Sequence, residues 1–284
     1  MKLLRKLPDK AYISLQFFKR FKRFPNLKSP KTFNEKLQWL KLNDRREVYT
    51  EMVDKYEAKE YVSRLIGEEY VIPNLGVWDS PEQIDFDTLP QSFVLKWNHD
   101  SGSVIVCKDK SRLDRAAVVE RLAKYKDHNG YWYGREWPYK NIKPKIIAEQ
   151  FLDAGDEGLI DYKFYCFGGE PRFLYVSKGL ENHETASISF LTLDWKFAPY
   201  ERTDFKPFSE LPQKPSRFDQ MVKLAKILSE GHDFLRVDLY QVEERIYFSE
   251  LTFYPCAGYM PFANPEHDLE VGQMLTLNTK KQAK

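Results

Sequence analysis

The feature that most constrains the fold lies near the end of the chain, where two runs of β-forming residues flank a short connector. Residues 235–241 and 245–252 are rich in aliphatic and aromatic side chains, and the connector 242–244 is short enough to predict a β-hairpin. Successive side chains of a strand point to opposite faces, so alternate residues share a face. Four polar side chains are therefore expected to gather on the hairpin: Arg236 and Asp238 from the first strand, and Glu250 and Thr252 from the second.

This cluster predicts a metal site. The carboxylates of Asp238 and Glu250 would repel each other unless a cation lay between them. Hard oxygen ligands suit Mg²⁺, which keeps several waters and takes its remaining ligands from nucleotide phosphates. The alternative, which the hairpin alone leaves open, is that these charges are exposed and solvated.

Length and composition fit a folded α/β protein. The chain has 284 residues, enough for two compact lobes or one large domain, and 15% of them are aromatic. Its 44 basic residues nearly balance its 42 acidic residues, so no overall field indicates nucleic-acid binding. Cys107, Cys166 and Cys256 lack a CxxC pairing, which favours a reducing compartment without a disulfide framework or a zinc site. No apolar run approaches the roughly 18 residues that a membrane-spanning helix needs. The start MKLLRKLPDK has no apolar secretion signal, and we expect a cytoplasmic protein.

Residues 1–30 form a basic and aromatic N-terminal arm. Residues 1–31 contain ten basic residues against one acidic residue, Asp9, with aromatic and aliphatic side chains between them. Such a segment, expected to be helical, favours contact with anionic lipid at the inner face of the membrane or with an acidic glycan. The alternative is an arm that packs its aromatic side chains on the body of the protein and leaves its charges solvated.

Helices are expected after the arm. Ser29 or Thr32 can begin a helix through residues 34–42, whose apolar positions recur at helical spacing. A second helical pattern covers residues 46–65. Residues 71–72 then form a short strand, and the Pro-Asn pair after them indicates a loop.

Two charged features of this region have competing interpretations. Asp54 and Lys55, on the second helical pattern, are most simply solvated surface charges. Asp85 and Asp87 form a DxD triplet, the motif with which many sugar-nucleotide transferases hold a metal. The triplet lies in an acidic connector, residues 80–90, and follows no clear apolar strand.

A flap is expected next. The strand 93–96 ends on Lys96, the polar loop 97–103 follows, and residues 104–106 form a returning strand. Backbone N–H groups of such a loop, together with Lys96, can cover phosphates. The segment is not a P-loop, because it lacks GxxxxGK[ST] and returns to a strand.

Two later segments suit ligand contact. Residues 130–140 hold five aromatic side chains around Arg135, which can stack a sugar or clamp an anion, or can equally cap the core. Residues 145–152 predict a buried strand that emerges into a polar segment, where its backbone groups can bind the edge of an adenine.

The remaining elements lead to the hairpin. Strands 161–167 and 171–177 are joined by a Gly-Gly turn, and strand 187–193 follows. An amphipathic helix is expected to begin at a Ser216 cap and to end at Gly231.

The order of these elements resembles the ATP-grasp superfamily, and the R-x-D and E-x-T triplets resemble the RxD and ExN signature of D-alanine–D-alanine ligases. Four longer strings are similar to the TupA-like ATP-grasp family of bacterial cell-surface polysaccharide loci: TFNEKLQWLKLNDR, LPQSFVLKWNHDSGS, GREWPYKNIKPKIIAEQ and DYKFYCFGGEPRF. The resemblance spans residues 31–258 and rests on strings far more specific than a single triplet.

The resemblance implies roles for individual residues. Those implied to bind ATP are Lys55, Lys96, Asn98, Ser101, Gly102, Ser103, Lys145, Glu149, Gln150, Phe151 and Leu152. Those implied to hold one or two Mg²⁺ ions at the phosphates are Asp238, Glu250 and Thr252. The group implied at the transferring phosphoryl is Arg236, assisted by Lys163 or Lys178. Those implied to contact the other substrates are Arg135, Trp137 and Gly258. Thr252 stands where the superfamily commonly has Asn, which leaves the number of metal ions open.

The implied fold is an α/β (α+β) ATP-grasp fold of two lobes, each with an antiparallel sheet, that grip ATP. After the arm, residues 31–90 would form a helical region, 91–158 the small lobe with the flap, and 159–284 the lobe with the metal site. The implied activity is ATP-dependent ligation of a carboxylate to an amine through an acyl phosphate.

The implied substrates are a uronic acid of a surface glycan and an amino acid or other amine. Two alternatives remain at this stage. A glycosyltransferase would use Asp85 and Asp87, and a non-catalytic nucleotide- or glycan-binding accessory protein would bind ATP without releasing ADP.

Overall fold

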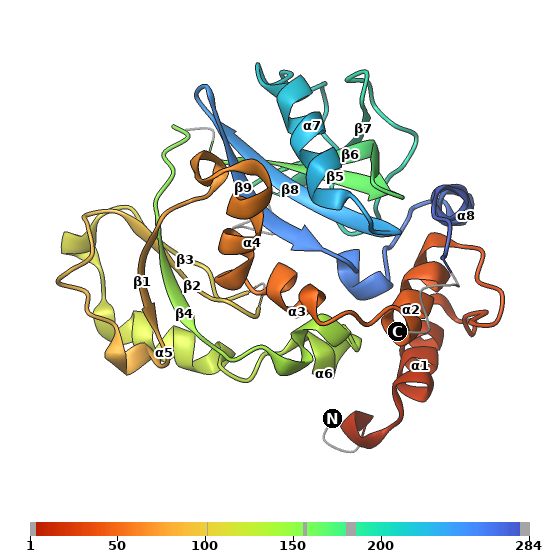
Figure 1. Ribbon diagram of the computed structural model, residues 1–284, viewed down its shortest axis with the longest axis horizontal. Helices are drawn as coiled ribbons and strands as arrows, with labels where there is room; N and C mark the ends of the chain where they lie inside the picture. Colours follow the sequence, from red (N-terminus) through yellow and green to blue (C-terminus); the bar gives the residue numbers. More distant parts are fainter. Residues whose placement is uncertain (1–3, 101, 156–157, 180–185, 279–284) are drawn as a thin grey trace.

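The computed structural model describes residues 4–100, 102–155, 158–179 and 186–278 and contains two antiparallel sheets with helices around them (Figure 1). The helices are α1 (Asp9–Phe21), α2 (Phe33–Asn43), α3 (Val48–Val53), α4 (Glu57–Ile66), α5 (Arg115–Tyr125), α6 (Gly130–Gly134), α7 (Phe218–Ser229) and α8 (Pro265–Met274). The strands are β1 (Asn74–Trp78), β2 (Phe93–Trp97), β3 (Ile105–Cys107), β4 (Ile146–Gln150), β5 (Ile160–Phe167), β6 (Glu170–Lys178), β7 (Ser187–Thr192), β8 (Phe234–Val242) and β9 (Arg245–Thr252).

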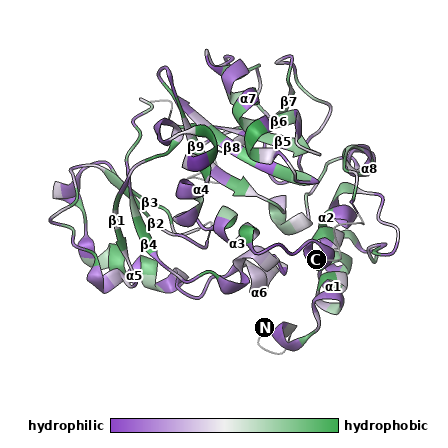
Figure 2. Cartoon of the chain, in the orientation of Figure 1, coloured by the Kyte–Doolittle hydropathy of each residue, from purple (hydrophilic) through white to green (hydrophobic). Residues whose placement is uncertain are grey.

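The smaller sheet has the strand order β1-β4-β2-β3, and the helix α5 packs against β2. Its strands are mostly hydrophobic in Figure 2, which agrees with their burial between α5 and the rest of the lobe. Trp97 anchors this packing, because its ring is fully buried and its indole Nε1 donates a 2.8 Å hydrogen bond to the backbone oxygen of Leu122. The expected strand–flap–strand unit is therefore present as β2 and β3, which pair in antiparallel register.

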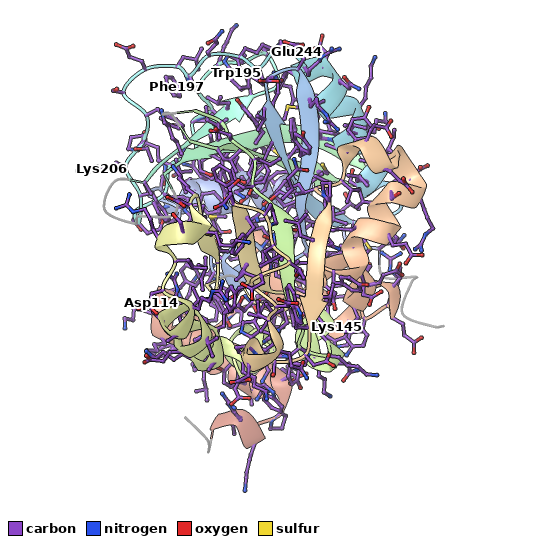
Figure 3. All side chains as sticks on the ribbon, turned by 90° about the vertical axis from the view of Figure 1, so that its left-hand side faces the viewer. Asp114, Lys145, Trp195, Phe197, Lys206 and Glu244 are labelled. Atoms are coloured by element: carbon purple, nitrogen blue, oxygen red, sulfur yellow. The ribbon has the colours of Figure 1, made fainter. Side chains whose placement is uncertain are left out.

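The larger sheet has the strand order β7-β6-β5-β8-β9, and α7 packs across β5, β6 and β8. Its core is aromatic: Phe33 of α2 contacts the rings of Tyr165, Phe167 and Phe234 at centroid distances of 6.2, 6.0 and 5.1 Å. Figure 3 shows the two lobes from the side, with Asp114 and Lys145 of the smaller lobe at the lower end and Trp195 and Glu244 at the upper end. Both sheets are antiparallel, and the α/β (α+β) expectation is confirmed.

The expected first helix is present, but the second is two helices. Thr32 caps α2 through a capping box with Glu35. The pattern over residues 46–65 breaks between α3 and α4, because the Asp54 Oδ1 accepts hydrogen bonds from the backbone N–H groups that begin α4, at 2.8 and 3.3 Å. Asp54 is 6% exposed, so the interpretation of this residue as a solvated surface charge is wrong.

Two further local expectations are wrong. The loop expected after Pro73 is a strand, β1, which forms because it pairs with β4, far along the chain. Ser216 does not cap α7: the N-cap position is Arg217, and the Ser216 hydroxyl donates a 3.0 Å hydrogen bond to Glu244 at the tip of the β8–β9 hairpin.

The arm forms the helix α1, which packs Tyr12, Ile13 and Phe17 against the body of the protein. Phe18 and Phe24 remain exposed, at 43% and 62%, and their rings stack at 4.9 Å. In the part of the chain that the structure describes, no helix has the length and apolar character to cross a bilayer. Contact of the exposed rings and the basic residues around them with anionic lipid stays a prediction.

Candidate active site

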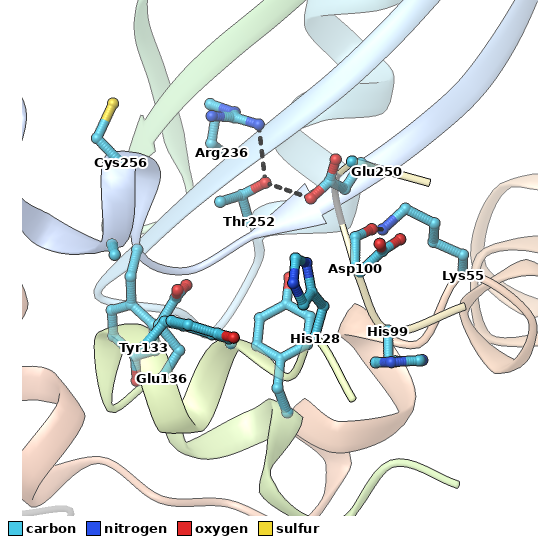
Figure 4. Close-up of a pocket in the computed structure, with 15 residues that line it drawn as sticks. Lys55, His99, Asp100, His128, Tyr133, Glu136, Arg236, Glu250, Thr252 and Cys256 are labelled. Carbon is cyan, nitrogen blue, oxygen red and sulfur yellow. Dashed lines mark hydrogen bonds between the residues drawn. The ribbon is translucent and has the colours of Figure 1, made fainter. Parts of the chain in front are cut away.

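A cavity of about 500 Å³ lies where the two lobes meet. The smaller lobe and the α3–α4 break contribute Lys55, together with Asp100 and Gly102 of the flap. The hairpin of the larger lobe contributes Glu250 and Thr252. In Figure 4, Arg236 lies between this pair and Cys256. Residues that are far apart in the sequence thus line one space.

The hairpin places its polar side chains as the alternation of strand residues predicted. Across β8 and β9, Arg236 pairs with Thr252 and Asp238 pairs with Glu250. The Arg236 Nη2 donates a 2.9 Å hydrogen bond to the Thr252 hydroxyl, which in turn donates to Glu250 at 3.2 Å (Figure 4). The four side chains therefore form one connected network.

Asp238 is the buried centre of this network. It is 0% exposed, and its carboxylate accepts two hydrogen bonds from Arg236 and one from Lys163, each at 2.7 Å. Lys163 also pairs with Asp161 at 2.9 Å. Burial by itself lowers the pKa of Lys163, but the carboxylates of Asp161 and Asp238 raise this pKa well above its usual value. The Asp238 carboxylate is therefore held by two side chains that stay positively charged, Arg236 and Lys163.

Glu250, in contrast, faces the cavity. Burial raises the pKa of its carboxyl, but Lys55, Arg236 and Lys163 lower this pKa below its usual value, so Glu250 is ionised at neutral pH. The five groups Arg236, Lys163, Asp161, Asp238 and Glu250 carry two positive and three negative charges, an excess of one negative charge.

These residues fit Mg²⁺. Among the described residues there is no cluster of three or more His, Cys, Asp and Glu side chains arranged to hold a metal. Mg²⁺ does not require such a cluster, because it binds through one or two carboxylates and fills its remaining positions with water and substrate phosphates. Glu250 and Thr252 offer hard oxygen atoms to the cavity, and Asp238 is the cross-strand neighbour of Glu250. The ligand roles of the three residues stay predictions.

A second ionic cluster lies on the smaller sheet. Glu149 is 4% exposed and pairs with Lys96 at 2.5 Å and with Lys59 at 2.7 Å. Lys59 also donates a 2.8 Å hydrogen bond to the backbone oxygen of Ile72. Burial lowers the pKa of Lys59 to about 8, against the opposing effect of Glu149. Lys96 therefore faces Glu149 and does not line the 500 Å³ cavity, which the flap reaches through Asp100 and Gly102.

Lys59 was missed by the sequence interpretation. It lies four residues after Lys55, so on the helix expected over residues 46–65 the two lysines would share a face, and this spacing was a signal for a second cation.

The root of the flap is fixed by hydrogen bonds. Asn98 is fully buried: its amide donates to Asp54 at 2.8 Å, and its Oδ1 accepts the backbone N–H of Lys145 at 2.9 Å. The Lys55 backbone N–H donates to the Asn98 carbonyl at 3.0 Å, and its ammonium donates to the Asp100 carbonyl at 2.5 Å. The Asn98 side chain thus holds the base of the flap, and a phosphate contact would have to break these hydrogen bonds.

The tip of the flap is shaped in the same way. The Ser103 hydroxyl accepts the backbone N–H of Trp97 at 2.8 Å and donates to Asp100 at 2.5 Å. Gly102 lines the cavity, whereas Ser101 lies outside the described residues.

The segment predicted to bind adenine follows Glu149. Gln150 is exposed, and its backbone N–H donates to the Pro73 carbonyl at 3.1 Å. Phe151 is half-buried, and Leu152 packs in a small apolar cluster with Ile72 and Tyr247. The Lys145 ammonium lies 5.2 Å from the centroid of the Tyr56 ring. The adenine contacts of these residues stay predictions.

Four further predicted residues, like Lys96, lie away from the cavity lining. Lys178 lines a different cavity, at the end of β5 and β6 beside Tyr162. Arg135 is 1% exposed, and its Nη2 donates to the carbonyls of Arg5 and Leu7 at 2.9 and 3.2 Å. This buried guanidinium therefore fastens the N-terminal segment, and a direct substrate contact would require it to leave that position.

The other two are packing positions. Trp137 begins a half-buried 3₁₀ turn, Trp137–Asn141. Gly258 is buried with a φ of +69°, and a Cβ atom there would lie 2.6 Å from the Gln38 Nε2. Its lack of a side chain lets the turn after β9 approach α2.

The DxD triplet does not form a comparable site. Asp85 and Asp87 are exposed; Asp85 accepts the backbone N–H of Asp87 at 3.1 Å, and Asp87 pairs with Arg115 at 2.7 Å. The triplet is a surface turn whose charges are locally paired, and this geometry does not favour the glycosyltransferase alternative.

Several solved structures are similar to this chain at low sequence identity. The D-alanine–D-alanine ligase of Helicobacter pylori is 15% identical over 86% of this chain and 69% of its own, with a TM-score of 0.46. The ATP complex of the Bacillus anthracis ligase is 13% identical over 71% of this chain, with a TM-score of 0.42, and this chain spans 55% of its length. Truncated Cdc123 of Schizosaccharomyces pombe is 10% identical over 75% of this chain and 88% of its own, with a TM-score of 0.43.

No protein with a curated description matches this sequence. A family model described as TupA-like ATPgrasp matches residues 35–276, which cover the α2 helix, both sheets and the hairpin. The chain therefore belongs to the TupA-like ATP-grasp family.

Proposed function

We propose that the protein is an ATP-dependent carboxylate–amine ligase that forms an amide through an acyl phosphate. One observation carries this proposal: Lys55, the flap residues Asp100 and Gly102, and the hairpin residues Glu250 and Thr252 line the same cavity. A cation, a polar loop and oxygen ligands are the groups that a triphosphate and its metal ion require.

Different residues of the cavity would have different roles. Lys55 and the flap would bind the phosphates of ATP, and Glu250, Thr252 and Asp238 would hold Mg²⁺. The metal ion would neutralise phosphate charge where the phosphoryl group is transferred. Arg236 is held in place by Asp238 and Thr252, so its guanidinium is already oriented toward the region where negative charge develops.

In the reaction that follows, the protein acts mainly by positioning the reactants. A substrate carboxylate oxygen attacks the γ-phosphorus of ATP and ADP departs, which leaves an acyl phosphate. The amine nitrogen, after its ammonium form has lost a proton, then attacks the acyl carbon; phosphate departs, the nitrogen releases a further proton, and an amide remains. The flap has to cover the cavity during these steps, because water would hydrolyse the acyl phosphate.

The proposed substrates are a uronic-acid carboxylate of a cell-surface glycan and an amino acid or similar amine. The cavity supports this class through its aromatic side, where Tyr133, Tyr139 and Tyr254 line the space beside the hairpin. Aromatic faces suit a sugar ring, and the Arg236 guanidinium suits a carboxylate.

An ADP-release screen tests the proposal. Uronic acids and their nucleotide-linked forms would be crossed with the amino acids, and mass spectrometry would detect condensation with loss of water. We expect ADP release only when both substrates are present. ATP binding without ADP release for every pair would instead identify an accessory protein, and binding of a sugar nucleotide with indifference to ATP would identify a glycosyltransferase.

Lys96→Ala is expected to weaken MgATP binding by about 10- to 100-fold, since the Lys96 ammonium, which pairs with Glu149 in this structure, would turn to a phosphate when ATP binds and this charged hydrogen bond is lost. The fold should persist, because Lys59 still pairs with Glu149 at 2.7 Å. Calorimetry with a non-hydrolysable ATP analogue measures the affinity. Lys124→Ala is the control, because this exposed lysine pairs with the exposed Glu120 on α5 at 2.8 Å. An affinity equal to that of the wild type would remove Lys96 from the nucleotide site.

A further inference from the structure

The side of the cavity opposite Lys55 is built from α6 and the segment that joins it to β4. Tyr133, Glu136 and Tyr139 line it, and Ala257 of the turn after β9 completes it. In Figure 4, Glu136 lies beside Tyr133 and well apart from Lys55 and Asp100. Glu136 is thus a carboxylate in the cavity at a place that the phosphate-binding groups do not occupy.

Lys41 lies behind this side of the cavity, which we call the wall. Its ammonium cannot donate a hydrogen bond to Glu136. Lys41 is fully buried, and its ammonium donates three hydrogen bonds: to the carbonyls of Gly134 at 2.6 Å and Ala257 at 2.5 Å, and to Gln38 at 3.0 Å. An ammonium has three N–H groups, so none remains for Glu136. Lys41 fixes the backbone of the wall, and the carboxylate is left to face the cavity.

The Glu136 carboxylate has no hydrogen-bond donor among the residues that the structure describes. Burial raises the pKa of this carboxyl; Lys41 opposes the rise, and the negative charge of Glu250 adds to it. Glu136 is half-buried, and Arg236 also opposes the rise, but neither cation donates a hydrogen bond to the carboxylate.

The wall leaves room for this carboxylate. A Cβ atom at Gly134 would lie 2.8 Å from both the Glu136 Oε1 and the Ala257 Cβ, and one at Gly130 would lie 3.5 Å from the same Oε1. The two glycines of α6 therefore allow the carboxylate to lie against the helix backbone, at the edge of the open cavity.

We propose that Glu136 binds the ammonium group of the amine substrate, with Tyr139 and Tyr254 beside it. This assignment rests on the proposed ligase function and adds to it a residue for the second substrate. The charges of the cavity then match the reactants: cations at Lys55 and Arg236 face the triphosphate and the carboxylate, and an anion faces the amine. The aromatic faces can further attract a cation.

The test compares Glu136→Gln, which keeps the shape of the side chain and removes its charge, with the wild type. Amine-dependent ADP release should show a KM for the amine raised by about 10- to 100-fold, the loss of one charged hydrogen bond. The KM for ATP should change by less than about twofold, because the nucleotide contacts are elsewhere. Glu120→Gln, an exposed carboxylate on α5, is the control.

A neutral nucleophile separates binding from chemistry. Hydroxylamine is uncharged at neutral pH and intercepts acyl phosphates as hydroxamates. Glu136→Gln should form hydroxamate at the wild-type rate. An equal loss with hydroxylamine and with the amine, or an unchanged KM for the amine, would overturn the assignment.

A binding measurement needs no turnover and keeps the two proposals distinguishable. In the presence of Mg²⁺ and a non-hydrolysable ATP analogue, each amino acid and its α-hydroxy acid counterpart would be compared by thermal shift. We expect at least one amino acid to stabilise the wild type more than its hydroxy acid, and Glu136→Gln to lose this difference. A wild type that no amino acid stabilises overturns the ammonium site. A wild type that does not respond to the nucleotide analogue contradicts the proposed function itself.

Discussion

Glu250→Gln is expected to lower ATP turnover by about 10²- to 10³-fold, the range observed when one preorganised electrostatic group is removed from a transition state. Glu250 is the ionised carboxylate that faces the cavity, and glutamine cannot replace its charge at a metal ion. The fold should persist, because the glutamine oxygen can still accept the hydrogen bond that Thr252 donates at 3.2 Å. The rate of ADP release over a range of Mg²⁺ concentrations measures the effect.

Glu244→Gln is the matched control for this prediction. Glu244 is an exposed carboxylate at the tip of the same hairpin, where it pairs with Arg217 at 3.0 Å. Its replacement should leave both turnover and thermal stability within experimental error. Full turnover in Glu250→Gln, with an unchanged dependence on Mg²⁺, would show that the metal assignment is wrong.

Asp238→Asn is expected to destabilise the protein by about 3–5 kcal/mol, the usual effect of breaking a buried ion pair from one side. The change would leave Arg236 and Lys163 buried without the carboxylate that both contact at 2.7 Å. Although Asp238 and Glu250 are direct neighbours across the hairpin, replacing Asp238 is therefore expected to lower the stability of the fold, whereas replacing Glu250 is expected to lower turnover. Urea unfolding followed by tryptophan fluorescence measures the free energy.

Asp219→Asn provides the comparison for the stability measurement. This carboxylate is exposed on α7 and lies 3.7 Å from the Lys214 ammonium, so its loss should change the free energy of unfolding by less than about 1 kcal/mol. A similarly small change for Asp238→Asn would contradict the structural role of the buried network.

Features with a short sequence period were predicted well. The hairpin and the shared face of Arg236 and Thr252 follow from the alternation of strand residues, whereas the register, which shifts between Asp238 and Leu239, was not predicted. The strand β1 was missed because a proline precedes it, a glycine interrupts it, and its partner β4 lies far along the chain. The break between α3 and α4 was missed because apolar spacing continues across Asp54, whose capping role depends on its burial beside Asn98.

The site was predicted only in part, again because contacts between distant segments leave no local pattern in the sequence. The chemistry of Lys55 and Glu250 was expected, and both line the cavity. Asn98 was expected at phosphate from the family resemblance of its loop, but its hydrogen bonds to Asp54 and Lys145 come from distant segments that no local pattern reveals. Glu136 was passed over within an aromatic string, since a lone carboxylate has no distinctive spacing.

The helix α1 and the wall that carries Glu136 are joined at several points. The Tyr12 hydroxyl donates to the Tyr133 carbonyl at 3.0 Å, the Tyr131 hydroxyl donates to Asp9 at 2.9 Å, and Arg135 is buried under the same helix. The helix α1 thus stabilises the position of that side of the cavity. We expect a shortened protein that begins after α1 to keep the proposed nucleotide pocket and to lose the alignment of Glu136 with the amine substrate, so trimming the arm to ease purification would mimic a catalytic defect.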